Sequence, residues 1–200
     1  MTRKMQVAVL AVALSLAAAS CSGGGLGLGG EVEGDYRDAI TTALVWPSPE
    51  AIDVYIATTL QGSTAAVDEA DRESVRAAFR AWTSGFSGMN VAFVDSASGA
   101  EITVQFASQA AGVPIARTSV DAAPSGTEIE AATILFIVEP APHDLDLTAL
   151  HEVGRALGMV EGTSPNAFDV MSGQPNLIDA PSARDLATLE AIYDEQGVSI

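Results

Sequence analysis

The sequence has one cysteine, two histidines and few basic residues. A single cysteine, Cys21, excludes an intramolecular disulfide. Only 9 lysines and arginines stand against 26 aspartates and glutamates, which gives a formal net charge of -17. So acidic a chain repels nucleic acid and anionic lipid head groups, because binding to either requires basic side chains that neutralise phosphates. We therefore expect no nucleic-acid partner.

The apolar run near the N-terminus, at residues 5–19, is shorter than the roughly 20 residues that a membrane-spanning helix needs. It follows two basic residues and leads into Ala-Ala-Ser-Cys at residues 18–21, which is typical of a cleaved signal peptide. That tetrapeptide resembles a bacterial lipobox, whose cysteine is acylated. We expect a signal peptide at residues 1–20, a lipid anchor on Cys21 as the only contact with a membrane, and export to the bacterial cell envelope, or secretion if Cys21 is not lipidated.

A glycine-rich segment follows the predicted lipidation site. Residues 22–34 hold too few apolar side chains to bury a core of their own. We assign residues 21–43 to the lipidated cysteine and a tether, and residues 44–200 to one domain, because that length is sufficient for a single compact core.

Hydrophobic periodicity after residue 44 indicates an α+β fold with a mixed sheet covered by helices. Alternating apolar residues predict strands, whereas apolar residues three and four positions apart predict amphipathic helices. Ser182 and Asp185 form a capping pattern at the start of the last helix. The predicted strands lie at residues 52–56, 91–94, 102–106 and 132–138, and the predicted helices lie within residues 71–85, at 147–157 and after 181.

The most informative segment begins at His151, reads His-Glu-Val-Gly-Arg-Ala-Leu-Gly-Met-Val-Glu, and is followed by Val170-Met171. It resembles the metzincin signature H-E-x-x-H-x-x-G-x-x-H with its Met-turn. Residues 75–106 and the C-terminal helix also look like parts of a matrixin catalytic domain. The resemblance covers residues 44–200 and implies a metzincin-like fold, with a twisted mixed sheet, a long helix, an active-site helix, a Met-turn and a C-terminal helix.

In that signature, two histidines on one face of a helix and a third ligand beyond the turn hold a zinc ion, while the glutamate polarises the metal-bound water. The resemblance places His151 at the first ligand position and Glu152 at the general-base position. Gly158 takes the turn position and Met171 the Met-turn. Arg155 stands at the second ligand position, where a protonated guanidinium has no lone pair to give a metal.

The third ligand position is occupied by Glu161, a milder replacement because a carboxylate can bind zinc. The ligands of the signature converge on one point, so we expect Arg155 and Glu161 to face each other in a salt bridge. The other histidine, His143, lies outside the motif.

The resemblance implies a zinc metalloendopeptidase, with zinc as its cofactor and a protein or peptide as its partner. Because Arg155 opposes metal binding, we expect a catalytically impaired domain that binds peptide or protein in the old cleft. Two alternatives stay open. One is an active peptidase that uses His151, Glu161 and a further ligand, with Glu152 as base; the other is a structural envelope lipoprotein.

Two other kinds of site find little support in the sequence. Nucleophilic hydrolysis is disfavoured because only two histidines could act as base and the lone cysteine lies at the tether. Asp169 and other acidic residues lack the spacing of a calcium-binding loop, so we interpret them as helix caps or solvated groups.

Overall fold

The computed structural model describes residues 34–108, 115–139, 145–160, 164–173 and 178–200. The predicted signal peptide, Cys21 and most of the glycine-rich segment lie outside these ranges. The described residues form a five-stranded sheet, three α-helices and one short 3-10 helix. None of the described helices is long and apolar enough to cross a membrane.

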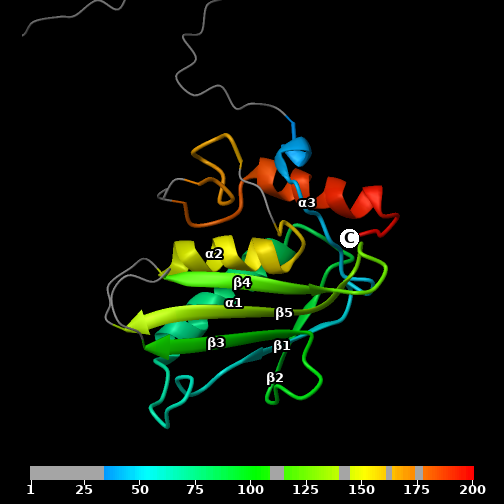
Figure 1. The fold of residues 1–200 in the computed structure, drawn as a ribbon. Helices are drawn as coiled ribbons and strands as arrows, with labels where there is room; N and C mark the ends of the chain where they lie inside the picture. Colours follow the sequence, from blue (N-terminus) through cyan, green and yellow to red (C-terminus); the bar gives the residue numbers. More distant parts are fainter. Residues whose placement is uncertain (1–33, 109–114, 140–144, 161–163, 174–177) are drawn as a thin grey trace, which may run out of the picture. The chain divides into compact units, whose positions relative to one another are not determined.

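The sheet has the strand order β2-β1-β3-β5-β4, in which β4 alone runs antiparallel to its neighbour (Figure 1). The α+β class and the mixed sheet predicted from the sequence are therefore confirmed. The strands are β1 (Ile52–Ile56), β2 (Val91–Val94), β3 (Ile102–Ser108), β4 (Ala116–Ala122) and β5 (Ile129–Glu139). The helices are η1 (Arg37–Ala39), α1 (Glu69–Thr83), α2 (Leu145–Ala156) and α3 (Ala183–Glu195).

Strand β4 is the one strand that the sequence analysis does not predict. Among the described strands it lies at the edge of the sheet and pairs only with β5, in a register that sets Thr118 opposite Ile134. Its side chains alternate between half-buried and exposed, and Val120 is its only large apolar residue. An edge strand needs no strong hydrophobic pattern, because one neighbour supplies its hydrogen bonds and one of its faces remains wet.

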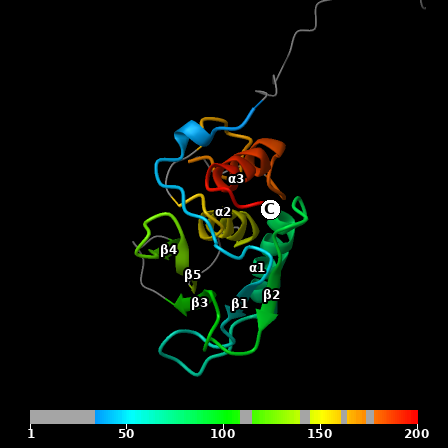
Figure 2. The ribbon, with the colours of Figure 1, turned by 90° about the vertical axis from the view of Figure 1, so that its right-hand side faces the viewer.

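The core lies between the sheet and helices α1 and α2. Alternate residues of β1 and β3, such as Val54 and Val104, are fully buried, and so are Phe79 and Trp82 on one face of α1. Figures 1 and 2 show α2 between the sheet and α3. The helix that carries His151 is therefore packed on both sides.

The C-terminal end of α2 is held by hydrogen bonds from two distant segments. The last carbonyl groups of a helix have no partner within the helix. Here the indole N–H of Trp46 donates to the carbonyl of Ala156 at 3.0 Å, and the hydroxyl of Tyr193 donates to that of Leu157 at 2.8 Å. Gly158 then turns the chain with a φ of +135°, a conformation that L side chains rarely adopt. The position of α2 is thus fixed by the segment before β1 and by α3.

Helix α2 approaches α1 closely at Gly154. A Cβ atom at this position would lie 2.6 Å from Cζ2 of Trp82 and 2.7 Å from Sδ of Met171. The indole N–H of Trp82 also donates to the carbonyl of Leu150 at 2.8 Å. Glycine at position 154 therefore allows α1, α2 and the Met171 turn to pack together.

The folded part of the chain begins before residue 44, the position that the sequence predicts as the start of the domain. The compact unit extends from Glu33 to Ile200, and both Tyr36 and Ile40 are buried in the core. The backbone N–H of Tyr36 donates to the hydroxyl of Thr188 in α3 at 2.9 Å. The glycine-rich composition nearby makes this segment hard to predict from the sequence, because Tyr36 and Ile40 are its only large side chains in the core.

The substitution Gly154→Ala is expected to lower the free energy of unfolding by about 1–2 kcal/mol, measured by urea denaturation. Alanine favours a helix over glycine by roughly 1 kcal/mol, but overpacking a filled core costs about 1–3 kcal/mol or more. Gly85→Ala is the matched control, since its Cβ would meet only the flexible end of Leu186, at 3.1 Å. A Gly154→Ala protein as stable as the wild type would contradict the close packing at this position.

Candidate functional site

His151 lies on α2 and is half-buried. Its Nδ1 atom lies 3.0 Å from the backbone carbonyl oxygen of Val170. A carbonyl oxygen only accepts, so Nδ1 carries the proton in this hydrogen bond and Nε2 of the neutral ring keeps its lone pair. A histidine held in this way is oriented as a metal-ligating histidine would be.

Glu152 is buried against strand β4 and has an exposed fraction of only 8%. The hydroxyl Oγ1 of Thr118 lies 2.5 Å from its Oε2 atom and 3.0 Å from its backbone carbonyl oxygen. The carboxylate at the predicted general-base position is thus engaged by a neighbouring strand. Thr118 could not be predicted from the sequence, because its strand, β4, has little apolar pattern.

Arg155 follows His151 by one helical turn and therefore lies on the same side of α2. It is half-buried, and its Nε atom is buried with no hydrogen-bond partner among the described residues. The predicted partner, Glu161, lies outside the described residues, as does His143. The proposed salt bridge between Arg155 and Glu161 stays a prediction.

The described part of this site does not fit a catalytic zinc ion. Such an ion needs three protein ligands and an open position, whereas α2 offers His151 and a guanidinium that cannot ligate. No group of three or more histidine, cysteine, aspartate or glutamate side chains that could hold a metal occurs among the described residues.

The turn at residues 164–173 lies against α2. Met171 is fully buried, and its sulfur would be 2.7 Å from a Cβ added at Gly154. The backbone N–H of Ser164 donates to the carbonyl of Met171 at 2.9 Å. The same turn presents the Val170 carbonyl to His151, so the position of the imidazole depends on the conformation of this turn.

A fully buried carboxylate, Asp185, holds this turn in place. It accepts from the backbone N–H of Val170 at 2.9 Å and from that of Ser182 at 2.8 Å. It also accepts from the hydroxyl of Tyr36, near the start of the described chain. Ser182 and Asp185 form the capping box that the sequence predicts at the start of α3. The additional bonds to Val170 and Tyr36 join segments far apart in the chain, and no local pattern indicates them.

A second buried carboxylate, Asp169, lies beside the first. It accepts from the hydroxyl groups of Ser164 and Ser182, the latter at 2.7 Å, and pairs with Nε of Arg184 at 3.1 Å. Its exposed fraction is 1%, so Asp169 is not the solvated or capping group that the sequence analysis expects. Both carboxylates therefore fix the turn of residues 164–173, which lies against α2.

The chain matches no known family model and no curated protein sequence.

Replacing Asp185 by asparagine should lower the free energy of unfolding by roughly 2–4 kcal/mol, because an amide presents a donor to N–H and O–H groups that are themselves donors. Thermal and urea unfolding would measure this loss. Asp194→Asn, on the exposed side of α3, is the matched control and should change stability by less than about 0.5 kcal/mol. Equal effects of the two substitutions would show that Asp185 does not organise the turn.

The stability of the protein should fall at alkaline pH. Burial, and then the negative charge of Asp185, raise the pKa of Tyr36 far above its ordinary value, and burial also raises the pKa of Tyr193. Both hydroxyls therefore stay protonated in the folded chain above about pH 10, whereas those of the unfolded chain release their protons. The contribution is complete below pH 10 and declines above it, by about 1.4 kcal/mol per pH unit for each tyrosine.

Urea unfolding between pH 9 and pH 11 would measure this slope. Tyr36→Phe and Tyr193→Phe should each reduce this slope by up to about 1.4 kcal/mol per pH unit, which is the effect of one proton. Each should also lower the stability at pH 7 through a lost hydrogen bond. An unchanged slope in Tyr36→Phe would contradict the buried contact between Tyr36 and Asp185.

Proposed function

We propose that this domain has a metzincin-like fold without a working zinc centre. In this proposal it binds peptide or protein segments and does not cleave them. The single observation that carries the proposal is the pair of side chains, His151 and Arg155, on one side of α2. Its retained histidine is oriented by the Val170 carbonyl, whereas the next position on the same side is a half-buried arginine. A guanidinium at that position supplies positive charge but no lone pair that could bind a metal.

The environment of Glu152 also supports a loss of catalysis. A general base must reach the water that it activates. The carboxylate of Glu152 is buried, and one of its oxygens lies 2.5 Å from the Thr118 hydroxyl. This contact favours a structural role for Glu152, as a link between α2 and β4.

Strand β4 favours a peptide as the ligand. It is the edge strand beside α2, and among the described residues its outer side pairs with no further strand. An exposed edge offers unpaired backbone groups to an extended peptide, which can add as a further strand. This is the observation that favours peptide binding over a purely structural role.

The proposed location rests on the N-terminal sequence alone. We propose that the chain is exported, cleaved before Cys21 and attached to a bacterial membrane by a lipid on that residue, because a basic start, a short apolar run and Ala-Ala-Ser-Cys occur in order. The glycine-rich segment would then separate the folded domain from the membrane surface.

Zinc titration of the purified chain by calorimetry, with metal content by mass spectrometry, tests the lost metal centre. We expect no sub-micromolar zinc binding by the wild type. The double substitution Arg155→His and Glu161→His, which completes the three-histidine set, is expected to bind one zinc ion tightly. Adding Glu152→Gln to that variant should leave zinc binding intact, because the glutamate is not a ligand.

A wild-type chain that cleaves casein in an EDTA-sensitive manner would instead support the active peptidase. Hydrogen exchange distinguishes the remaining alternative. A mixture of casein peptides should protect backbone amides of β4 in the wild type, and the complete absence of protection would favour a structural lipoprotein.

A further inference from the structure

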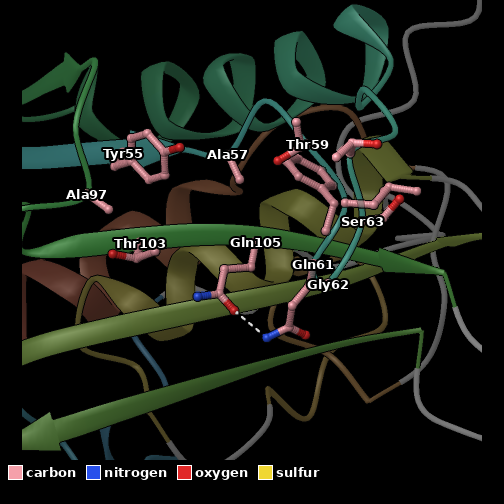
Figure 3. Close-up of a pocket in the computed structure, with 12 residues that line it drawn as sticks. Tyr55, Ala57, Thr59, Gln61, Gly62, Ser63, Ala97, Thr103 and Gln105 are labelled. Carbon is pink, nitrogen blue, oxygen red and sulfur yellow. Dashed lines mark hydrogen bonds between the residues drawn. The ribbon is translucent and has the colours of Figure 1, made fainter.

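The face of the sheet that the helices leave open carries a hollow of about 790 Å³ (Figure 3). Tyr55 of β1 and Thr103 and Gln105 of β3 line its floor, and the loop at residues 57–64 forms its wall. The floor residues alternate with fully buried core residues such as Val54 and Val104, so they point away from α1 and α2. The hollow and the His151 site therefore lie on opposite sides of the sheet.

The lining of the hollow is uncharged, and it combines polar with apolar side chains. The chain carries 26 acidic residues, yet no charged side chain occurs among the described residues that line this hollow. It offers instead hydroxyl and amide groups, which both donate and accept hydrogen bonds. A charged ligand would need an opposite charge that the lining does not supply, so the chemistry favours a neutral ligand with many hydroxyl groups.

Much of this hydrogen-bonding capacity is available. The side-chain amide of Gln61 donates to Oε1 of Gln105 at 3.3 Å, a contact that Figure 3 shows across the hollow. This bond leaves the carbonyl oxygen of Gln61 as an acceptor and the amide nitrogen of Gln105 as a donor. Within the described residues, the hydroxyls of Tyr55 and Thr103 make no hydrogen bond that would compete with a ligand.

The wall of the hollow is fixed before any ligand arrives. The backbone N–H of Ala57 donates to the carbonyl of Val104 at 2.9 Å, and that of Gln61 donates to the carbonyl of Phe106 at 2.7 Å. Leu60 is buried and anchors the loop in the core. Such preorganisation lowers the entropic cost of binding.

We propose that this hollow binds a neutral carbohydrate. The ring of Tyr55 supplies an apolar surface for the C–H face of a sugar, and the paired amides of Gln61 and Gln105 supply a donor and an acceptor for its hydroxyls. The volume lies within the range of small-molecule sites, about 300–1,000 Å³. A peptide is the poorer fit, because the hollow presents side chains on a sheet face rather than unpaired backbone at an edge.

Titration of the full-length, isotope-labelled chain with maltohexaose, cellohexaose and chitohexaose, followed by NMR, tests this proposal. At least one of these neutral oligosaccharides should shift the signals of Tyr55, Gln61 and Gln105 in a saturable manner. The double substitution Gln61→Ala and Gln105→Ala should weaken that binding at least about tenfold, as expected for the loss of two hydrogen-bonding groups. Gln196→Ala, an exposed glutamine beyond α3, is the matched control and should bind as the wild type does.

Several outcomes would overturn the carbohydrate site. Two concern the oligosaccharides: no saturable binding to any of the three, or binding that persists in the double variant. The others concern different ligands: stronger binding of the acidic polysaccharide alginate, or occupation of the same residues by casein peptides or by a second copy of the chain. Arg155→His should leave carbohydrate binding unchanged, so the outcome at this hollow is independent of the proposed function of the His151 site.

Discussion

The carboxylate of Asp185 is the constraint on which the candidate site depends. A buried carboxylate must be surrounded by donors, because leaving it unpaired in the core costs several kcal/mol. Asp185 meets that requirement with N–H groups of the residue 164–173 turn and of α3, and with the hydroxyl of Tyr36. One side chain thereby fixes three segments at once. The Val170 carbonyl that orients His151 comes from the turn fixed in this way.

The residues that shape the site and the residues that would carry chemistry can be separated. Gly154, Met171, Trp82 and Tyr193 act through packing and backbone hydrogen bonds, and none of these contacts requires a metal. Arginine at position 155 is therefore compatible with the support of the helix. Fold and activity thus depend on different residues, so the fold alone does not establish an activity.

Sequence patterns predicted the elements with strong periodicity and missed those that depend on distant partners. The stripe of Val75, Phe79 and Trp82 indicated α1, and the alternation of Ile52, Val54 and Ile56 indicated β1, because their burial follows directly from the period of the element. Strand β4 escaped prediction because an edge strand has little apolar pattern.

The same limit applies to the candidate site. The signature located His151, Glu152 and Arg155 on one helix, but the contact of Glu152 with Thr118 arises only when β4 is placed beside α2. The uncharged hollow depends in a similar way on which strands are neighbours, since Tyr55 and Gln105 are 50 positions apart in the chain and lie on adjacent strands.

The first buried side chain of the described chain is Tyr36, and it contacts the same carboxylate that fixes the turn beneath α2. A pull along the chain from its N-terminal side would thus meet resistance first at this contact. Load on the segment before Tyr36 would be carried into Asp185 and from there to the turn that faces His151. In a tethered protein, mechanical tension and the geometry of the site would then be coupled through Tyr36.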